Sequence, residues 1–263
     1  MLKFSPANVK IEALGKVPAL ATFLTGKRKV YSFDLISGYS CPHANECFSK
    51  AVVDPVTGKK SIQDGKNTQF RCFSASQEVL FTNVYNLRKA NFDGLRGKTA
   101  GEMFRLLAEA LPKNVGIVRI HVAGDFFNQE YFDAWLAIAL VRTDVLFYAY
   151  TKSLPYWIAR RDQMPANFVL TASRGGRKDD MIEKHGLRSV KVVFSEAEAG
   201  SLEIDHTDEH AANPDTRNTD FALLLHGTQP KGSKASDAIK VLKLNGTKFS
   251  YSRNEKAGAK SDI

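Results

Sequence analysis

The sequence predicts an α/β fold, specifically a partial (β/α)6 TIM-like barrel, and three observations lead to this prediction. Five apolar segments recur at spacings of 29, 22, 22 and 31 residues, with helix-like sequence between the first of them. Each segment is almost continuously apolar, which is typical of parallel strands covered on both faces. Polar residues follow nearly every segment, which favours a barrel mouth that collects the chemistry over an open doubly wound sheet. The five segments begin at Ile117, Leu146, Phe168, Val190 and Phe221.

The N-terminal third contributes the remaining strands. Residues 17–36 contain two apolar stretches around a basic turn, and this pattern predicts a pair of strands, the second over Val30–Ile36. That second strand brings the predicted barrel to six strands. Residues 51–69 are rich in Gly, Lys, Asp and Thr, and we expect them to form a solvated excursion.

Helix signals occupy the intervals between strands. Ser74 and Gln77 match a capping box ahead of the helix-like sequence VLFTNVYNLRKA. Residues 102–111 carry an apolar stripe typical of an amphipathic helix. Asn128 is expected to cap the helix that follows it. Further helices are expected in LPYWIARRD, KDDMIEKHG and SKASDAIKVLKL.

The chain is expected to form one domain over residues 1–245, followed by a basic tail over residues 246–263. Residues 197–220 have almost no apolar side chains and are predicted to form a long surface loop or lid. This segment contains carboxylates and imidazoles that suit a metal, but a solvated loop is favoured because no scaffold flanks it. These side chains are Asp205, His206, Asp208 and His210.

The composition is basic, with a net charge of +9 and a pI near 9.4. Such a charge suits either a solvated surface or a polyanionic partner such as nucleic acid or a nucleotide. No apolar run is long enough to span a membrane, and the first residues lack the apolar core of a signal peptide. We therefore expect a cytoplasmic protein without a membrane partner. In a reducing compartment, an odd count of three cysteines argues against disulfides.

The three cysteines, Cys41, Cys47 and Cys72, lie within 32 residues and are predicted to form a soft-metal site. Their segment, residues 37–73, follows the first barrel strand and contains glycine, proline and polar residues that let it wrap around a ligand. Cys72 precedes a helix, where the dipole and free N–H groups favour a thiolate. Three thiolates suit an iron–sulfur cluster with one iron open to a small molecule. With His43 they would instead form a Cys3His zinc site, and ordinary buried cysteines are the third alternative.

A strand that leads into a three-cysteine loop, followed by a strand that ends in a glycine–acid pair (HVAGDFF), resembles the radical S-adenosylmethionine superfamily. This resemblance implies a partial barrel of the radical SAM type with a [4Fe–4S] cluster on Cys41, Cys47 and Cys72. It also implies S-adenosylmethionine on the fourth iron. The gaps of five and twenty-four residues between the cysteines depart from that superfamily's C-x3-C-x2-C pattern.

The same resemblance implies cofactor-binding roles at the strand ends. Gly124 and Asp125 stand where the superfamily's glycine–glycine–acid strand end binds the amino group of S-adenosylmethionine. Other strand-end positions expected to face the cofactor are Thr151, Lys152, Ser173, Arg174, Ser195, His226 and Thr228.

A second resemblance covers more of the chain. The stretches VRIHVAGDFFNQEYFDAW, FYAYTKS and FALLLHGTQPKGSKA are similar to the gene-product-eighty-eight family of bacteriophages and mobile elements, over roughly residues 17–245. This resemblance implies a phage-encoded protein in the cytoplasm of a host cell and carries no activity with it.

Two classes of function remain open. The first is a cytoplasmic enzyme of the radical S-adenosylmethionine type that acts on a nucleotide or nucleic acid and receives electrons from a host donor. The second is a binding module without catalysis, in which zinc or a cluster staples residues 41–72 and the basic tail contacts nucleic acid or a host protein. A cluster used for electron transfer or redox sensing is a further alternative.

Overall fold

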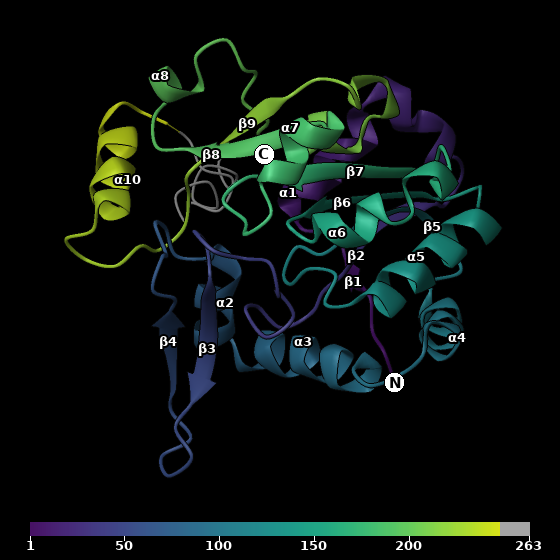
Figure 1. Ribbon diagram of the computed structural model, residues 1–263, viewed down its shortest axis with the longest axis horizontal. Helices are drawn as coiled ribbons and strands as arrows, with labels where there is room; N and C mark the ends of the chain where they lie inside the picture. The colour runs from purple at the N-terminus through teal and green to yellow at the C-terminus, as the bar shows by residue number, and fades with distance from the viewer. Residues whose placement is uncertain (248–263) are drawn as a thin grey trace, which may run out of the picture.

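The computed structural model describes residues 1–247 and confirms the α/β class. Within these residues the main sheet has seven strands in the order β1-β2-β5-β6-β7-β8-β9 (Figure 1). β1 is antiparallel to β2, and the other neighbours are parallel. The six parallel strands follow one another in chain order, and β9 does not pair with β2, so the described sheet is open. The strands are β1 (Ser5–Pro6), β2 (Lys29–Phe33), β5 (Val115–Ile120), β6 (Leu146–Thr151), β7 (Phe168–Ser173), β8 (Ser189–Val193) and β9 (Phe221–Leu224).

All six predicted barrel strands are present as parallel strands of this sheet. The basic tail predicted over residues 246–263 lies, from residue 248 onward, outside the described residues.

Ten α-helices and four 3-10 helices occur in residues 1–247. The α-helices are α1 (Val9–Glu12), α2 (Phe73–Leu80), α3 (Thr82–Leu95), α4 (Ala100–Ala110), α5 (Gln129–Val141), α6 (Leu154–Ile158), α7 (Asp180–His185), α8 (Glu196–Ala199), α9 (Glu209–Ala212) and α10 (Lys234–Leu244). The 3-10 helices are η1 (Ala13–Lys16), η2 (Pro18–Phe23), η3 (Arg161–Gln163) and η4 (Pro214–Thr216).

The excursion predicted over residues 51–69 is instead mostly a hairpin. β3 (Ser49–Val53) and β4 (Lys60–Asp64) pair antiparallel and project away from the main sheet (Figure 1). Asp54 stabilises the connecting turn because its carboxylate accepts the N–H groups of Val56 and Thr57. The polar composition did not indicate these two short strands, in which more buried residues alternate with more exposed ones over most of their length.

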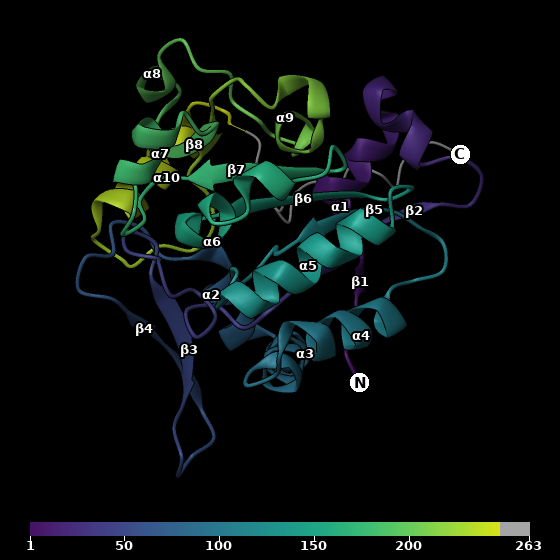
Figure 2. The same cartoon turned by 45° about the vertical axis from the view of Figure 1, so that its right-hand side comes forward.

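Helices cover both faces of the sheet (Figure 2), and an apolar cluster lies on each face. On one face, α4 and α5 pack on the sheet, and the side chain of Trp135 lies fully buried among aromatic residues. On the other face, Leu14 and Leu20 of the N-terminal segment and Ala211 of α9 form the covering layer. The interior of the predicted barrel is therefore filled by the chain's own N-terminal residues and by α9.

The first of the two strands predicted within residues 17–36 is wrong, because residues 18–23 form the 3-10 helix η2. Pro18 occupies the first position of this helix, where its missing N–H carries no cost. Leu20 is fully buried against the sheet face. The segment thus covers the sheet rather than adding a strand to it.

The lid predicted over residues 197–220 is partly buried instead of solvated throughout. Asp205, Asp208 and His210 are buried, and no group of three or more His, Cys, Asp or Glu in residues 1–247 is arranged to hold a metal ion. Asp208 forms ion pairs with Lys10, at 2.7 Å, and with Arg119. Charged residues of this polar segment can be buried because they pair with residues far away in the sequence.

Of the two predicted helix caps, the one at Asn128 is confirmed and the one at Ser74 is wrong. Asn128 caps α5, as expected, because its side chain accepts the N–H of Tyr131 at 2.9 Å. The capping box at Ser74 is wrong, since α2 begins at Phe73 with Cys72 as its N-cap. Ser74 lies inside the helix and donates its hydroxyl to the carbonyl of Val122 at 3.0 Å.

His121 is a buried residue with a left-handed backbone, at φ 71°. Its Nε2 lies 3.0 Å from the Tyr131 hydroxyl, while its Nδ1 has no hydrogen-bond partner in residues 1–247. Burial lowers the pKa of His121 to about 3, and Arg119 acts in the same direction. The folded protein therefore holds this imidazole neutral.

The depressed pKa of His121 predicts an acid-dependent loss of stability. Below pH 6.5 the imidazole is protonated in the unfolded chain, whereas in the folded chain it stays neutral down to about pH 3. The unfolding free energy therefore falls as the pH drops through this range. Between pH 7 and pH 5, His121 should cost about 2 kcal/mol of unfolding free energy. Burial also lowers the pKa of His226, to about 4, so part of the loss persists without His121. Urea unfolding at both pH values should therefore show a loss about 2 kcal/mol smaller in His121→Asn than in the wild type. The exposed His206→Asn control should keep the wild-type loss.

Candidate metal centre

The three cysteines lie beyond the carboxyl end of β2. Cys41 and Cys47 belong to the loop between β2 and β3, and Cys72 is the N-cap of α2. Each is partly buried and none is in a disulfide. Burial raises the pKa of the Cys41 thiol well above its usual range, and the nearby Asp125, Cys72 and Cys47 raise it further. The fold therefore brings together cysteines that lie up to 31 residues apart in the sequence.

Opposing effects act on the pKa of the Cys72 thiol. Burial raises the pKa of Cys72 to about 11, and Cys47 acts in the same direction. The backbone N–H groups of Ala75 and Ser74, at the start of α2, act in the opposite direction. Its backbone N–H donates to the Ser49 hydroxyl at 3.2 Å, which joins the start of α2 to β3. A helix start that offers N–H groups to sulfur suits a thiolate ligand.

A buried ion pair fixes the start of the cysteine loop. Glu78 of α2 accepts the backbone N–H and the hydroxyl of Ser37, at 3.1 and 2.8 Å. The same carboxylate oxygen lies 3.2 Å from Arg88 of α3. Burial raises the pKa of Glu78, and Arg88 opposes that change. Two helices thus hold the loop that carries Cys41.

The far side of the cysteine loop docks on the turn after β7. Ala44 forms a backbone bridge with Gly176, and the N–H of Glu46 donates to the carbonyl of Gly175 at 2.9 Å. Arg177 returns two hydrogen bonds to this loop, from its backbone N–H to His43 and from its side chain to Ala44. The loop is therefore held at both ends.

Asp125 ties the end of β5 to the end of β6. Its carboxylate accepts the Thr151 hydroxyl at 2.6 Å and the Lys152 N–H at 2.8 Å, and it also accepts the N–H of Phe126. Burial raises the pKa of Asp125 to about 6, against the effect of these hydrogen bonds. Asp125 and Thr151 therefore lie together, close enough to Cys41 for Asp125 to raise the pKa of that thiol.

Gly124 lies directly against the cysteine loop. Its φ is 90°, and a Cβ at this position would lie 2.6 Å from the Ser40 Oγ and 2.8 Å from the Leu35 Cβ. Ser40 precedes Cys41. A residue without a side chain is required here for both reasons.

This close approach predicts that Gly124→Ala lowers the unfolding free energy by about 2 kcal/mol, from backbone strain and overpacking. Gly101→Ala is the matched control, because Gly101 is helical and open space surrounds it. The control should gain up to about 1 kcal/mol. Chemical denaturation of both variants measures the difference. A Gly124→Ala protein as stable as the control would contradict the contact.

The SRGG turn, Ser173–Gly176, does not offer its glycine N–H groups to a ligand. Asp179 accepts both, from Gly175 at 2.7 Å and from Gly176 at 2.9 Å. Arg174 forms an ion pair with Glu183 at 2.7 Å. The turn is therefore closed by a carboxylate of its own loop.

Lys152 is likewise engaged within the protein. Its Nζ donates to the Ser173 hydroxyl at 2.7 Å and to the Ser173 carbonyl at 3.0 Å. Thr151, Lys152 and Ser173 therefore form one connected edge across β6 and β7, and the ammonium group holds the two strand ends together.

The predicted residues beyond β8 and β9 fall in different places. Ser195 caps α8, where its hydroxyl accepts the N–H of Glu198. Thr228 is exposed. The His226 ring packs against Phe73, with centroids 4.9 Å apart. His226 is thus the member of this group that the structure places beside Cys72.

Two site residues that the sequence did not indicate are Asp34 and Gln229. Asp34 accepts the N–H groups of Val122 and Ala123, at 2.7 and 3.3 Å, and so orients the turn before Gly124. The Gln229 side chain pairs with the backbone N–H and carbonyl of Arg71, at 2.7 and 3.2 Å. It fixes the residue that precedes Cys72. Their partners are remote in the chain, and no local pattern marks either of them.

A cavity of about 210 Å³ opens beside the cysteines. Cys47 and Cys72 line one part of it, and His226, Lys10 and Arg119 line the rest together with apolar residues of β8 and β9. It thus extends from the thiols to the basic side chains on the sheet face that the N-terminal segment covers.

His43 does not join the cysteines in a four-ligand set. Its ring packs against Tyr156, with centroids 5.5 Å apart, and its Nε2 has no hydrogen-bond partner among residues 1–247. A single metal ion requires all of its donors at bond length. No group of three or more His, Cys, Asp or Glu meets that requirement in the described part of the chain. The Cys3His zinc alternative therefore gains no support.

Comparison with known proteins extends over most of the chain. Residues 4–243 match the family described as gene product 88. No curated protein and no solved structure matches the sequence. Among the helices of residues 1–247, none has the length and apolar character needed to cross a membrane. The family match covers nearly the whole chain, and the protein therefore belongs to the gene product 88 family.

Proposed function

We propose that the protein binds an iron–sulfur cluster, of the [4Fe–4S] type, through Cys41, Cys47 and Cys72. The observation that carries this proposal is that the three partly buried thiols lie close together: Cys72 and Cys47 both raise the pKa of Cys41, and Cys47 also raises the pKa of Cys72. Uncompensated thiolates beside Asp125 would be costly, and bound iron would supply the positive charge they lack. Each thiolate of a cluster binds a different iron, so the sulfurs need not surround one ion.

The donor set fits such a group. It consists of thiolates, which are the ligands of iron–sulfur clusters, and the helix start at Cys72 offers N–H groups that tune a cluster's potential. Partial exposure of each cysteine gives a route for assembly. When bound, the cluster would supply one-electron chemistry. The chain's own residues hold the loop in place, through Glu78 and Arg88, and shape the adjoining cavity.

We infer further that the protein is an enzyme of the radical S-adenosylmethionine type, acting on a nucleotide or nucleic acid in the cytoplasm. The chain order of the parallel strands favours the partial (β/α)6 barrel of that superfamily, because a doubly wound sheet reverses its order at a switch point. Gly124 and Asp125 lie beside the cysteine loop, where an amino group could meet the carboxylate. A host protein would donate the electrons.

Electron paramagnetic resonance of the dithionite-reduced protein tests the cofactor proposal, with and without S-adenosylmethionine. We expect a cluster signal that changes when S-adenosylmethionine is added, together with 5′-deoxyadenosine as a product. Asp125→Asn should weaken the response to S-adenosylmethionine and leave the signal itself. A cluster signal that does not change when S-adenosylmethionine is added, together with no 5′-deoxyadenosine, would overturn the enzyme assignment. The proposal that the protein binds a cluster would still stand.

A further inference from the structure

A second cavity, of about 670 Å³, lies at the opposite edge of the sheet from the cysteines. Phe168, Arg188 and Asp220 line it at or next to the amino ends of β7, β8 and β9. In a parallel sheet these ends lie across the sheet from the carboxyl ends that face the cysteine loop. No cysteine lines this cavity, so it is independent of the proposed cluster.

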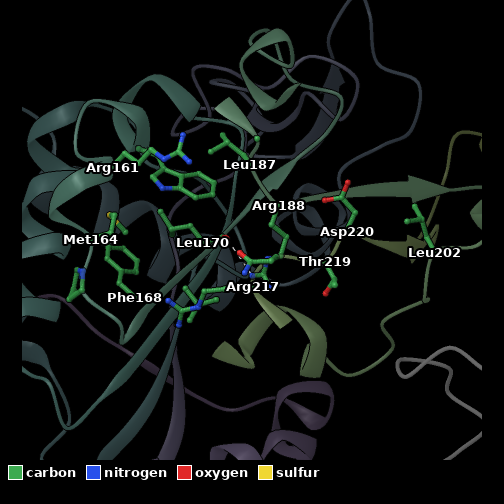
Figure 3. Close-up of a pocket in the computed structure, with 15 residues that line it drawn as sticks. Arg161, Met164, Phe168, Leu170, Leu187, Arg188, Leu202, Arg217, Thr219 and Asp220 are labelled. Atoms are coloured by element: carbon green, nitrogen blue, oxygen red, sulfur yellow. Dashed lines mark hydrogen bonds between the residues drawn. The ribbon is translucent and has the colours of Figure 1, made fainter. Parts of the chain in front are cut away.

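Three arginines line this cavity. Arg161 comes from η3, Arg188 from the start of β8, and Arg217 follows η4. Figure 3 shows Arg161 and Arg217 on opposite sides, with Leu170 and Arg188 between them. Asp220 is the one acidic side chain among the lining residues, and its carboxylate accepts the N–H of Ser189. The lining is therefore strongly cationic.

Backbone carbonyls, not carboxylates, hold these arginines. Arg161 donates to the carbonyl of His185 at 2.7 Å, and Arg217 donates to the carbonyls of Pro214 and Ala166 at 2.9 and 3.0 Å. None of the carboxylate–guanidinium pairs within residues 1–247 includes Arg161, Arg188 or Arg217. Carbonyls orient a guanidinium without cancelling its charge, which leaves the positive charge available to an anion.

Arg188 is the most informative of the three. It is 5% exposed, and its two terminal nitrogens donate to backbone carbonyls and to the Thr171 hydroxyl. Its Nε has no hydrogen-bond partner in the described residues. Asp205 and Asp220 lie close enough to act on the charge of Arg188, but neither forms an ion pair with it, and an anionic ligand in the cavity would add to this partial compensation.

The remainder of the lining is apolar. Trp157, Met164, Leu187 and Leu170 form walls beside the arginines. A volume of about 670 Å³ is within the range of small-molecule sites and exceeds the need of a bare inorganic anion. Arginine with an exposed aromatic face is the combination that binds a phosphate joined to a flat base.

We propose that this cavity binds a nucleotide, whose 5′-phosphate is attracted by the combined positive charge of Arg161, Arg188 and Arg217 and whose base packs against Trp157. The site is separate from the cysteine loop and does not depend on the function proposed above. The shared chemistry is a phosphate monoester on a nucleoside, either free or at the end of a nucleic-acid strand.

Tryptophan fluorescence tests this proposal directly, because the chain has two tryptophans and Trp135 is fully buried. Titration with adenosine 5′-monophosphate should quench Trp157 saturably, whereas adenosine should bind at least about tenfold more weakly. Arg161→Gln and Arg217→Gln together should raise the Kd of the nucleotide at least tenfold. The exposed Arg105→Gln should leave the Kd unchanged.

Two further measurements distinguish free nucleotide from a nucleic-acid end and check that weaker binding does not come from a misfolded variant. A 5′-phosphorylated oligonucleotide that competes as well as the mononucleotide assigns the site to a strand end, and one that fails to compete assigns it to free nucleotide. Arg161→Gln alone, at an exposed residue with one hydrogen bond, should retain the fold and still weaken binding. Absence of saturable binding, or an unchanged Kd in the double variant, would overturn the proposal.

Discussion

Asp208→Asn is expected to lower the unfolding free energy by about 3–5 kcal/mol at pH 7. The Asp208 side chain is fully buried and pairs with Lys10 and Arg119, whose side chains are 12% and 13% exposed. The hydroxyls of Tyr148 and Tyr150 also donate to it, each at 3.2 Å. Removing the negative charge takes away the carboxylate that neutralises two nearly buried cations. Denaturant unfolding measures the loss.

The stability that Asp208 contributes is expected to decrease at low pH. Burial alone would raise the pKa of Asp208, but Arg119 and Lys10 outweigh it and bring the pKa to about 2. A lowered pKa contributes stability that is present above pH 3.8 and is lost as the pH falls toward 2. The gap between wild type and Asp208→Asn should therefore narrow below pH 4.

Asp144→Asn is the matched control for Asp208. Asp144 also has two arginine partners, Arg28 and Arg142, but its side chain is 42% exposed. Hydrogen bonding from Arg142 lowers the pKa of Asp144 as well, so the two aspartates differ chiefly in burial. The exposed pair should contribute less than about 1 kcal/mol. Equal losses in the two variants would contradict the account of the buried network.

The second large expected effect concerns the cysteines. Cys41→Ser, Cys47→Ser and Cys72→Ser should each lower bound iron at least about tenfold and remove the visible absorption of anaerobically purified protein. Each variant should still unfold cooperatively, because Glu78 and Arg88 hold the loop independently of the thiols. His43→Asn is the control, since His43 packs on Tyr156. Loss of iron in that control equal to the cysteine variants would contradict a three-thiolate site.

The parallel strands could be predicted because their signal is local. Each of the six is a short, largely apolar run, and most of its residues are buried in the sheet. The covering of the sheet could not be predicted in the same way. Residues 18–23 and 209–212 have their role set by what they pack against, so an apolar stretch became a 3-10 helix and a polar one became buried.

The crowding of the cysteines was visible in the sequence, but the residues that hold their loop were not. Ser37 and Glu78 are 41 positions apart, Asp34 and Val122 are 88 apart, and Arg71 and Gln229 are 158 apart. Such contacts appear only once the sheet has brought the strand ends to one edge. The turn at Ser173–Gly176 differs, because the contact that closes it is local: Asp179 accepts the N–H groups of Gly175 and Gly176.

The central claim is that three thiolates of this chain hold an iron–sulfur cluster. Metal and acid-labile sulfide analysis of protein purified without oxygen, together with its absorption spectrum, tests that claim most directly. We predict iron and sulfide in equal amounts, near four of each per chain, a broad visible band and little zinc. One zinc per chain without sulfide, or a colourless protein free of both metals, would contradict it.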